Sequence, residues 1–144
     1  MVAILRFALH DRTLGILADH VREVLRAAKP SPLPEAPPLV VGVLNVRGEQ
    51  IPVYDIRARF GLPARALLAT DAIVVAKAGE RWAGIVVDRA LDLVHSDSIA
   101  DVIPGACLTS GTALLPDGSL VICDLAHFLS SDEEDALARA FSLA

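Results

Sequence analysis

The sequence predicts an all-β protein in which two small barrels share a core, followed by one C-terminal helix. Short apolar runs recur at regular spacing with turn residues between them, a pattern typical of barrels rather than of a parallel βαβ sheet. The chain also matches itself at a fixed offset of 69 positions. Its 144 residues suit one domain, but half of them cannot bury the apolar faces of a barrel alone. We therefore expect two half-size barrels packed against each other.

The internal repeat aligns apolar and turn residues of the two halves without a gap. Five matches carry it: Ala3-Ile4 on Ala72-Ile73, Gly15-Ile16 on Gly84-Ile85, Asp19 on Asp88, Gly42 on Gly111, and Asp55-Ile56 on Asp124-Leu125. We interpret this as a duplication. The prediction is a single domain over residues 1–144, with barrel subdomains at about 1–69 and 70–129 and a terminal helix at 130–144.

Each half contains the same elements in the same order. An opening strand meets a polar turn, and a returning strand continues into a third extended segment. These strands are expected at 3–8, 14–17 and 21–25, and again at 72–76, 82–87 and 91–95. A connection follows, which is rich in proline in the first half. Each half closes with a hairpin that turns at Arg47-Gly48 or at Asp117-Gly118, because glycine tolerates positive φ.

The last residues of the chain carry the signals of a helix. Ser131 precedes Asp132-Glu133-Glu134, which resembles a capping box and places acidic residues at the positive end of the helix dipole. Apolar residues then recur on one helical face, at Leu137, Ala140, Phe141 and Ala144. We expect this face to pack on a barrel.

Composition excludes several classes of function. The net charge is −5 without a cluster of Lys or Arg, so nucleic acid is not an expected partner. The apolar runs are far shorter than the roughly 20 residues of a membrane helix, and no signal peptide is recognised, so we expect a cytoplasmic protein. Cys107 and Cys123 lack metal-ligand spacing and are expected to be buried, reduced thiols.

No catalytic or cofactor-binding constellation is found. The four histidines are scattered, and phosphate-binding and nucleophile motifs are missing, so we predict neither an enzyme nor a metal or cofactor site. Four aspartates look like a carboxylate set, but they occupy repeated positions. Repetition favours turn or strand-end hydrogen bonds for them: Asp19, Asp55, Asp88 and Asp124.

One stretch resembles a known family. Residues 39–63, LVVGVLNVRGEQIPVYDIRARFGLP, are similar to the G-V-x-N-x-R-G-x-x-x-P-V-x-D-(L/I)-R-x-x-F-G motif of the CheW-like adaptors. The segment from Gly15 to Val24 and the run Gly84–Asp88 match two further family motifs. The resemblance implies two SH3-like five-stranded barrels. It also implies a non-enzymatic cytoplasmic adaptor that couples chemoreceptors to the histidine kinase CheA and is recruited to receptor arrays at the inner membrane.

The resemblance also implies two sets of binding residues. The receptor-binding set is Val21, Glu23, Val24, Gly42 and Arg47, and the kinase-binding set is Trp82, Val86 and Val87. The alternative to a binding role for Arg47 and Glu23 is an exposed ion pair that stabilises the fold only weakly. Val24 is weighed more towards core than contact, and Gly42 is expected where a strand or partner approaches its backbone. Alternation along a strand predicts that one of Val86 and Val87 faces the core and the other faces outward.

The predicted mechanism is geometric, because holding the receptor tip and the regulatory domain of CheA together makes their encounter intramolecular. Two alternatives stay open. One is a CheW-like scaffold of a non-flagellar chemosensory pathway that controls pili, surface motility or development. The other is a small-molecule-binding barrel, for which the sequence offers no convergent polar set.

Overall fold

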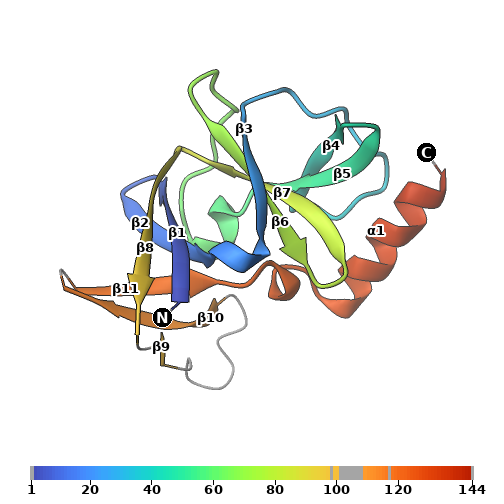
Figure 1. Cartoon of the computed structure of the whole chain (residues 1–144). Helices are drawn as coiled ribbons and strands as arrows, with labels where there is room; N and C mark the ends of the chain where they lie inside the picture. Colours follow the sequence, from blue (N-terminus) through green and yellow to red (C-terminus); the bar gives the residue numbers. More distant parts are fainter. Residues whose placement is uncertain (1, 98, 101–108, 117, 144) are drawn as a thin grey trace.

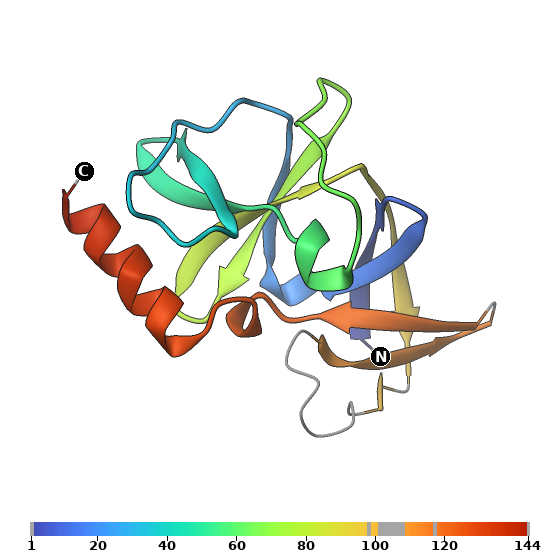
Figure 2. The same ribbon diagram turned by 180° about the vertical axis from the view of Figure 1, so that it is seen from behind.

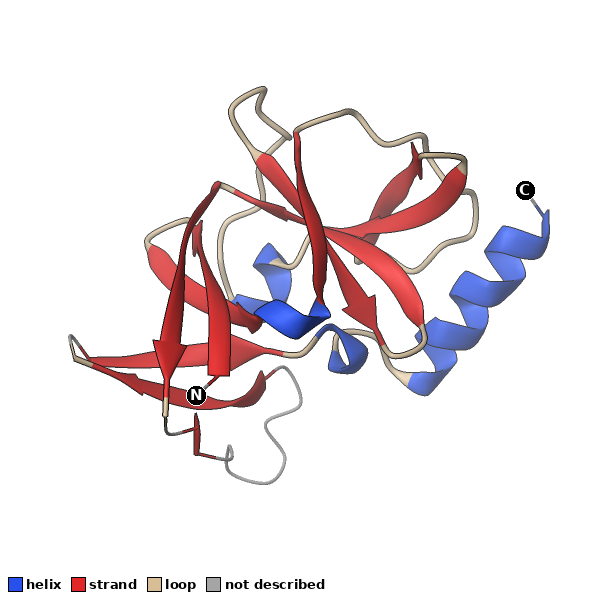
Figure 3. Cartoon of the chain, viewed as in Figure 1, coloured by secondary structure: helices blue, strands red, loops and turns tan. Residues whose placement is uncertain are grey.

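The computed structural model describes residues 2–97, 99–100, 109–116 and 118–143. Cys107, Asp117 and Ala144, which were named above, lie outside these residues. The described residues form short strands, three 3-10 helices of three or four residues and one C-terminal helix (Figures 1 and 3). Their bounds are β1 Val2–Leu9, β2 Arg12–Leu17, η1 Ala18–His20, β3 Val21–Arg26, β4 Val40–Val46, β5 Glu49–Tyr54, η2 Arg57–Phe60, β6 Ala72–Ala78, β7 Arg81–Val87, β8 Arg89–Ser96, β9 Ile99–Ala100, β10 Thr109–Leu115, β11 Gly118–Cys123, η3 Leu125–His127 and α1 Ser131–Leu143.

The strands form two sheets, which confirms the predicted all-β class. Sheet A has the order β8-β1-β2-β11-β10-β9, and its sixth strand, β9, is only two residues long. Sheet B has the order β3-β6-β7-β5-β4. The assignment of one barrel to residues 1–69 and the other to 70–129 needs correction, because each sheet takes strands from both halves. The two halves exchange strands: β3, β4 and β5 pair with β6 and β7, whereas β1 and β2 pair with strands after residue 88.

The duplication itself is confirmed by the hydrogen-bond register. At the offset of 69, the order β8-β1-β2-β11-β10 becomes β3-β6-β7-β5-β4. Individual pairs obey the same rule: Ile4 faces Leu17 in sheet A, and Ile73 faces Val86 in sheet B. The register shift in β10 recurs in β4, and the parallel contact of β11 with β2 recurs between β5 and β7.

Two glycines at equivalent positions allow each sheet to close tightly. A Cβ on Gly15 would lie 2.7 Å from Cγ2 of Ile4, and a Cβ on Gly84 would lie 2.8 Å from Cγ2 of Ile73. Contacts this short are not tolerated in a packed interior. Glycine is therefore required at these sites by close approach, and this explains the Gly-Ile match in the repeat.

The core has three parts, one of them shared between the sheets as predicted. The shared part joins Phe7 and Ile16 of sheet A to Val74 and Ile85 of sheet B, and it includes Leu137 of α1. Smaller clusters fill the inside of each sheet, from Val46 to Val86 in sheet B and around Ile4, Ala113, Leu120 and Ile122 in sheet A.

Helix α1 lies on the sheet B side of the molecule, away from sheet A (Figures 1 and 2). Its capping box begins one residue earlier than predicted. Ser130 Oγ accepts a hydrogen bond from Glu133 N at 3.1 Å, and Glu133 Oε1 accepts one from Ser130 N at 3.1 Å. Leu137 and Ala140 are buried and Phe141 is half-buried, as the helical face predicted.

Candidate functional site

The turn between β4 and β5 places Arg47 on the surface in an unusual backbone conformation. Arg47 has φ 53° and Gly48 has φ 85°, as in a type I′ hairpin turn. Asn45 Oδ1 accepts a hydrogen bond from Gly48 N at 2.8 Å and stabilises the turn. The glycine was predicted, but the positive φ of Arg47 was not. Glycine or asparagine suits this position better than arginine does, so backbone preference does not explain Arg47.

The predicted pair of Arg47 and Glu23 is brought together by the closing of sheet B. Nη1 of Arg47 lies 3.1 Å from Oε2 of Glu23, although β3 and β4 are at opposite ends of the strand order. The Arg47 side chain is 71% exposed and the Glu23 side chain only 16%. The contact lacks hydrogen-bond geometry, so the buried Oε2 accepts no hydrogen bond from the described residues. This carboxylate oxygen therefore keeps acceptor capacity beside an exposed guanidinium.

Two further residues complete what we call the charged cluster: Arg22, Glu23, Arg47 and Glu49. Arg22 Nε lies 3.4 Å from Glu23 Oε2, and Arg22 Nη1 lies 3.5 Å from Glu49 Oε1. Sequence reasoning missed Arg22 and Glu49, because only the curvature of sheet B brings the start of β3 next to the start of β5. The only sequence signal that could have indicated Arg22 was its position next to Glu23.

The apolar members of the receptor-binding set behave differently from one another. Val24 is 42% exposed, which reverses the preference for core, since β3 is an edge strand paired only with β6. Val21 is half-buried against the shared core. Gly42 is buried, and a Cβ there would lie 2.5 Å from the Ser31 carbonyl oxygen. The close approach expected at Gly42 is therefore made by the protein's own Pro30-Ser31 segment.

The prediction that one of Val86 and Val87 faces outward is wrong. Val86 is 7% exposed and Val87 is fully buried. The two side chains do alternate, with Val87 in the shared core and Val86 in the cluster inside sheet B. Both faces of β7 are covered, because the shared core packs on one face and the cluster inside sheet B packs on the other. Alternation gives the face of a residue but not whether that face is open.

Trp82 contacts a residue of the charged cluster and also packs against the apolar cluster that contains Val86. The guanidinium carbon of Arg22 is 5.4 Å from the centroid of the Trp82 ring, and Lys77 Nζ is 6.0 Å from it. The half-buried ring also packs against the apolar cluster inside sheet B. Trp82 therefore belongs spatially to the charged cluster.

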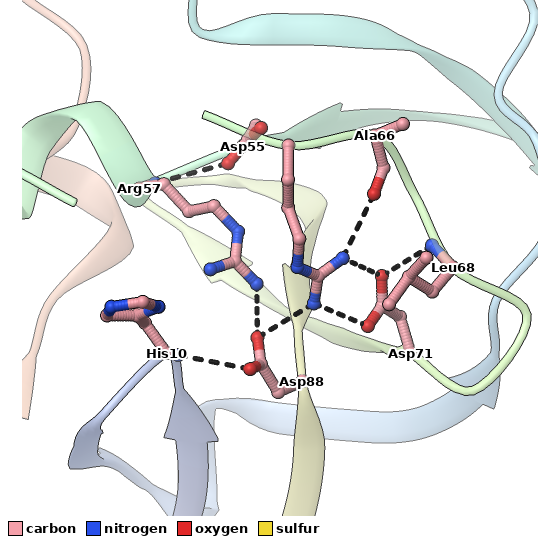
Figure 4. Close-up of polar contacts among 8 residues, drawn as sticks. His10, Asp55, Arg57, Ala66, Leu68, Asp71 and Asp88 are labelled. Carbon is pink, nitrogen blue, oxygen red and sulfur yellow. Dashed lines mark hydrogen bonds and ion pairs between the residues drawn. The ribbon is translucent and has the colours of Figure 1, made fainter. Parts of the chain in front are cut away.

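A second polar network joins the two sheets where β7 passes into β8 (Figure 4). Asp88 accepts hydrogen bonds from Arg57, which is 3% exposed, from Arg65 Nη2 at 3.1 Å, and from His10 N at 3.2 Å. Arg65 also donates two hydrogen bonds of 2.8 Å to Asp71, and these lower the pKa of the Asp71 carboxyl below its usual value. Because every carboxylate here has guanidinium partners, we assign the network to structure.

Turn hydrogen bonding is confirmed for one repeated pair of aspartates. Asp55 Oδ1 accepts from Arg57 N at 3.1 Å, and Asp124 Oδ1 accepts from Ala126 N at 3.0 Å. Cys123 is buried, and burial raises the pKa of its thiol to about 12, so it stays neutral as expected. The described residues include no group of three His, Cys, Asp or Glu that could hold a metal ion. No helix among them is long and apolar enough to cross a membrane.

The structure thus combines two sheets related by the internal repeat with a charged cluster at one end of sheet B. A family model described as the CheW-like domain matches residues 3–133, so the chain belongs to the CheW-like family. The chemotaxis protein CheW of Rhizobium meliloti is 27% identical over 141 residues, which cover 92% of this chain and 90% of that protein. Protein FrzA of Myxococcus xanthus is 34% identical over 98 residues, which cover 68% of this chain and 61% of FrzA.

A solved structure supports the same assignment. The crystal structure of the scaffolding protein TtCheW from Thermoanaerobacter tengcongensis is 27% identical in sequence, with a TM-score of 0.78, and the match covers 86% of this chain and 89% of that one. The chain is thus a non-enzymatic adaptor of the chemotaxis type, as its family is. Residues 134–143, most of α1, lie beyond the part matched by the family model.

Proposed function

We propose that this protein couples chemoreceptors to the histidine kinase CheA by holding each at a separate surface. Membership of the CheW-like family supports the proposal, as does the structural similarity to the scaffolding protein TtCheW. The observation that carries it is Arg47, an exposed arginine in a left-handed conformation beside the unsatisfied Glu23 Oε2. Such a guanidinium is retained against backbone preference, which favours a role in binding over a role in folding.

The receptor surface is proposed at the exposed end of β3 and the β4–β5 turn. Val24 offers apolar contact, while Arg47 and Glu23 offer charge and hydrogen-bonding capacity. The helical hairpin tip of a chemoreceptor is an amphipathic partner that suits such a surface. Val21 and Gly42 support it from beneath, since one packs on the shared core and the other allows Pro30-Ser31 to cross β4.

The kinase surface is proposed on another part of the molecule, where it binds the regulatory domain of CheA. Val86 and Val87 are buried and do not supply this contact directly. Sheet A exposes several large apolar side chains, and the most exposed of them are Leu93 of β8 and Leu114 of β10, each at 60%. Exposed leucines of this kind suit a protein interface, so we assign the kinase-binding role to this side.

The function follows from geometry alone. A domain that binds receptor and kinase together raises the effective concentration of one near the other to about the millimolar range. In this proposal the protein acts in the cytoplasm at receptor arrays. Purified protein should bind both a receptor-tip fragment and the CheA regulatory domain in separate calorimetric titrations. A protein that binds neither would refute the proposal.

A second candidate is a scaffold of a non-flagellar chemosensory pathway. The observation that favours it is the relative named FrzA, which is 34% identical, whereas the Rhizobium meliloti CheW is 27% identical. Such a scaffold would use the same residues with different receptors and a different kinase. The genes beside this one discriminate the two, because flagellar and pilus or motility operons differ.

A further inference from the structure

Trp82 lies at the end of sheet B that carries the charged cluster, where three chain segments meet. The start of β3 brings Arg22 over the indole ring, and Lys77 of β6 lies directly opposite Trp82 in the antiparallel pair β6–β7. A surface cavity of about 300 Å³ adjoins the ring on another side and is lined also by Glu49, Arg81 and Phe141. The ring is therefore central to this end of the molecule and not part of a separate edge.

Trp82 restrains Arg22, and through it the charged cluster. The Arg22 guanidinium has the ring at 5.4 Å, Glu23 Oε2 at 3.4 Å and Glu49 Oε1 at 3.5 Å. A planar guanidinium stacked on an indole loses much of its rotational freedom. Arg22 and Arg47 both contact the same oxygen of the Glu23 carboxylate, Oε2, at 3.4 Å and 3.1 Å. The ring therefore bears on the orientation of Glu23 through Arg22.

Two exposed cationic side chains, Arg47 and Lys77, form what we call the rim of the charged cluster. Arg47 is 71% exposed, and Glu23 is its one carboxylate contact among the described residues. Lys77 is exposed and forms no ion pair with any carboxylate in the described part of the chain. Glu23 and Glu49 are already engaged by Arg22. An incoming carboxylate is therefore the complementary chemistry for the rim.

We propose that Trp82 is a positioning residue of the receptor-binding surface, and that this surface accepts acidic side chains of the receptor tip at Arg47 and Lys77. The inference rests on the proposed function and deepens it, because it names the chemistry recognised on the receptor. It also transfers Trp82 from the kinase-binding set, where the family resemblance had placed it, to the receptor-binding set.

The test compares four variants with the unaltered protein, each titrated calorimetrically with a receptor-tip fragment and with the CheA regulatory domain. Trp82→Ala removes the ring, Trp82→Phe keeps an aromatic face, and Lys77→Gln removes the rim cation. Arg26→Gln is the matched control, because Arg26 is also exposed and lies at the far end of the same strand, β3, from Arg22. Melting curves of every variant show whether it folds.

Trp82→Ala and Lys77→Gln should each weaken receptor binding about threefold or more, while kinase binding stays unchanged. Trp82→Phe should restore most of the loss, and Lys77→Gln should flatten the dependence of receptor affinity on salt. If Trp82→Ala does not fold, the affinity of Lys77→Gln and its salt dependence still test the inference. Unchanged receptor affinity in Lys77→Gln, an equal loss in Arg26→Gln, or a selective loss of kinase binding would overturn the inference. Unaltered protein that binds neither partner would instead refute the proposed function.

Discussion

Replacing Arg47 by asparagine should separate binding from folding. Asparagine accepts the left-handed conformation of the first turn residue more readily than arginine does, so the backbone gains a few tenths of a kcal/mol. The lost contact is one ion pair of 3.1 Å in which the Arg47 side chain is 71% exposed, and such exposed pairs contribute about 0.2–1 kcal/mol. These effects oppose each other, so the free energy of unfolding should change by no more than about 0.5 kcal/mol.

Receptor binding should respond far more strongly to the same change. A guanidinium that hydrogen-bonds an acidic partner contributes about 1.5–3 kcal/mol, which corresponds to a loss of affinity of roughly 10- to 150-fold. Urea unfolding gives the first quantity, and calorimetric titration with a receptor-tip fragment gives the second. The CheA regulatory domain serves as the internal control and should bind with unchanged affinity. A collapse of stability, or equal losses for receptor and kinase, would show that Arg47 acts through the fold.

Two further predictions concern the interior. Val86→Glu and Val87→Glu should both unfold or strongly destabilise the protein, by about 3–5 kcal/mol, because each buries an unpaired charge; a variant with a normal melting curve would contradict the burial of that site. Asp71→Asn should cost stability near neutral pH, because Asp71 loses the ionic character of its hydrogen bonds from Arg65. The pKa of Asp71 is lowered from 3.8, so its contribution is complete above that value and disappears as the pH falls through the lowered pKa. Urea unfolding at pH 7 and at about pH 3 should show the difference between the two proteins shrinking in acid, and a constant difference would disprove the assignment.

Much of the fold can be predicted from local sequence patterns, and the features that cannot be predicted have a physical reason. The offset of 69 and the turn residues predict the strands and the duplication, because these depend on neighbours in sequence. The membership of each sheet does not depend on sequence neighbours, since exchanging the β1–β2 pair with the β6–β7 pair between the halves preserves every local pattern. The helix cap shows the same limit on a small scale: Ser130 and Ser131 are both suitable, and the backbone geometry selects Ser130.

The same distinction between local sequence patterns and the arrangement of strands in a sheet applies to the binding residues. Arg47 and Glu23 were predicted together, and the structure places them in contact. Val24 was assigned towards the core because a valine in a strand usually is, and only the edge position of β3 exposes it. Trp82 was grouped with its neighbours along β7, whereas its contact to Lys77 arises from the β6–β7 pairing and its contact to Arg22 from the pairing of β3 beside β6. Contacts that depend on how a sheet closes are not encoded at any fixed spacing.

The central claim is that one molecule holds receptor and kinase at the same time, and a three-component mass measurement tests it most directly. Sedimentation or light scattering of this protein with a receptor-tip fragment and the CheA regulatory domain should reveal a complex that contains all three chains. Adding saturating receptor fragment should leave the affinity for the regulatory domain unchanged or increased, because the two surfaces are separate. Displacement of the regulatory domain by the receptor fragment, with only two-chain complexes at every mixing ratio, would contradict the claim.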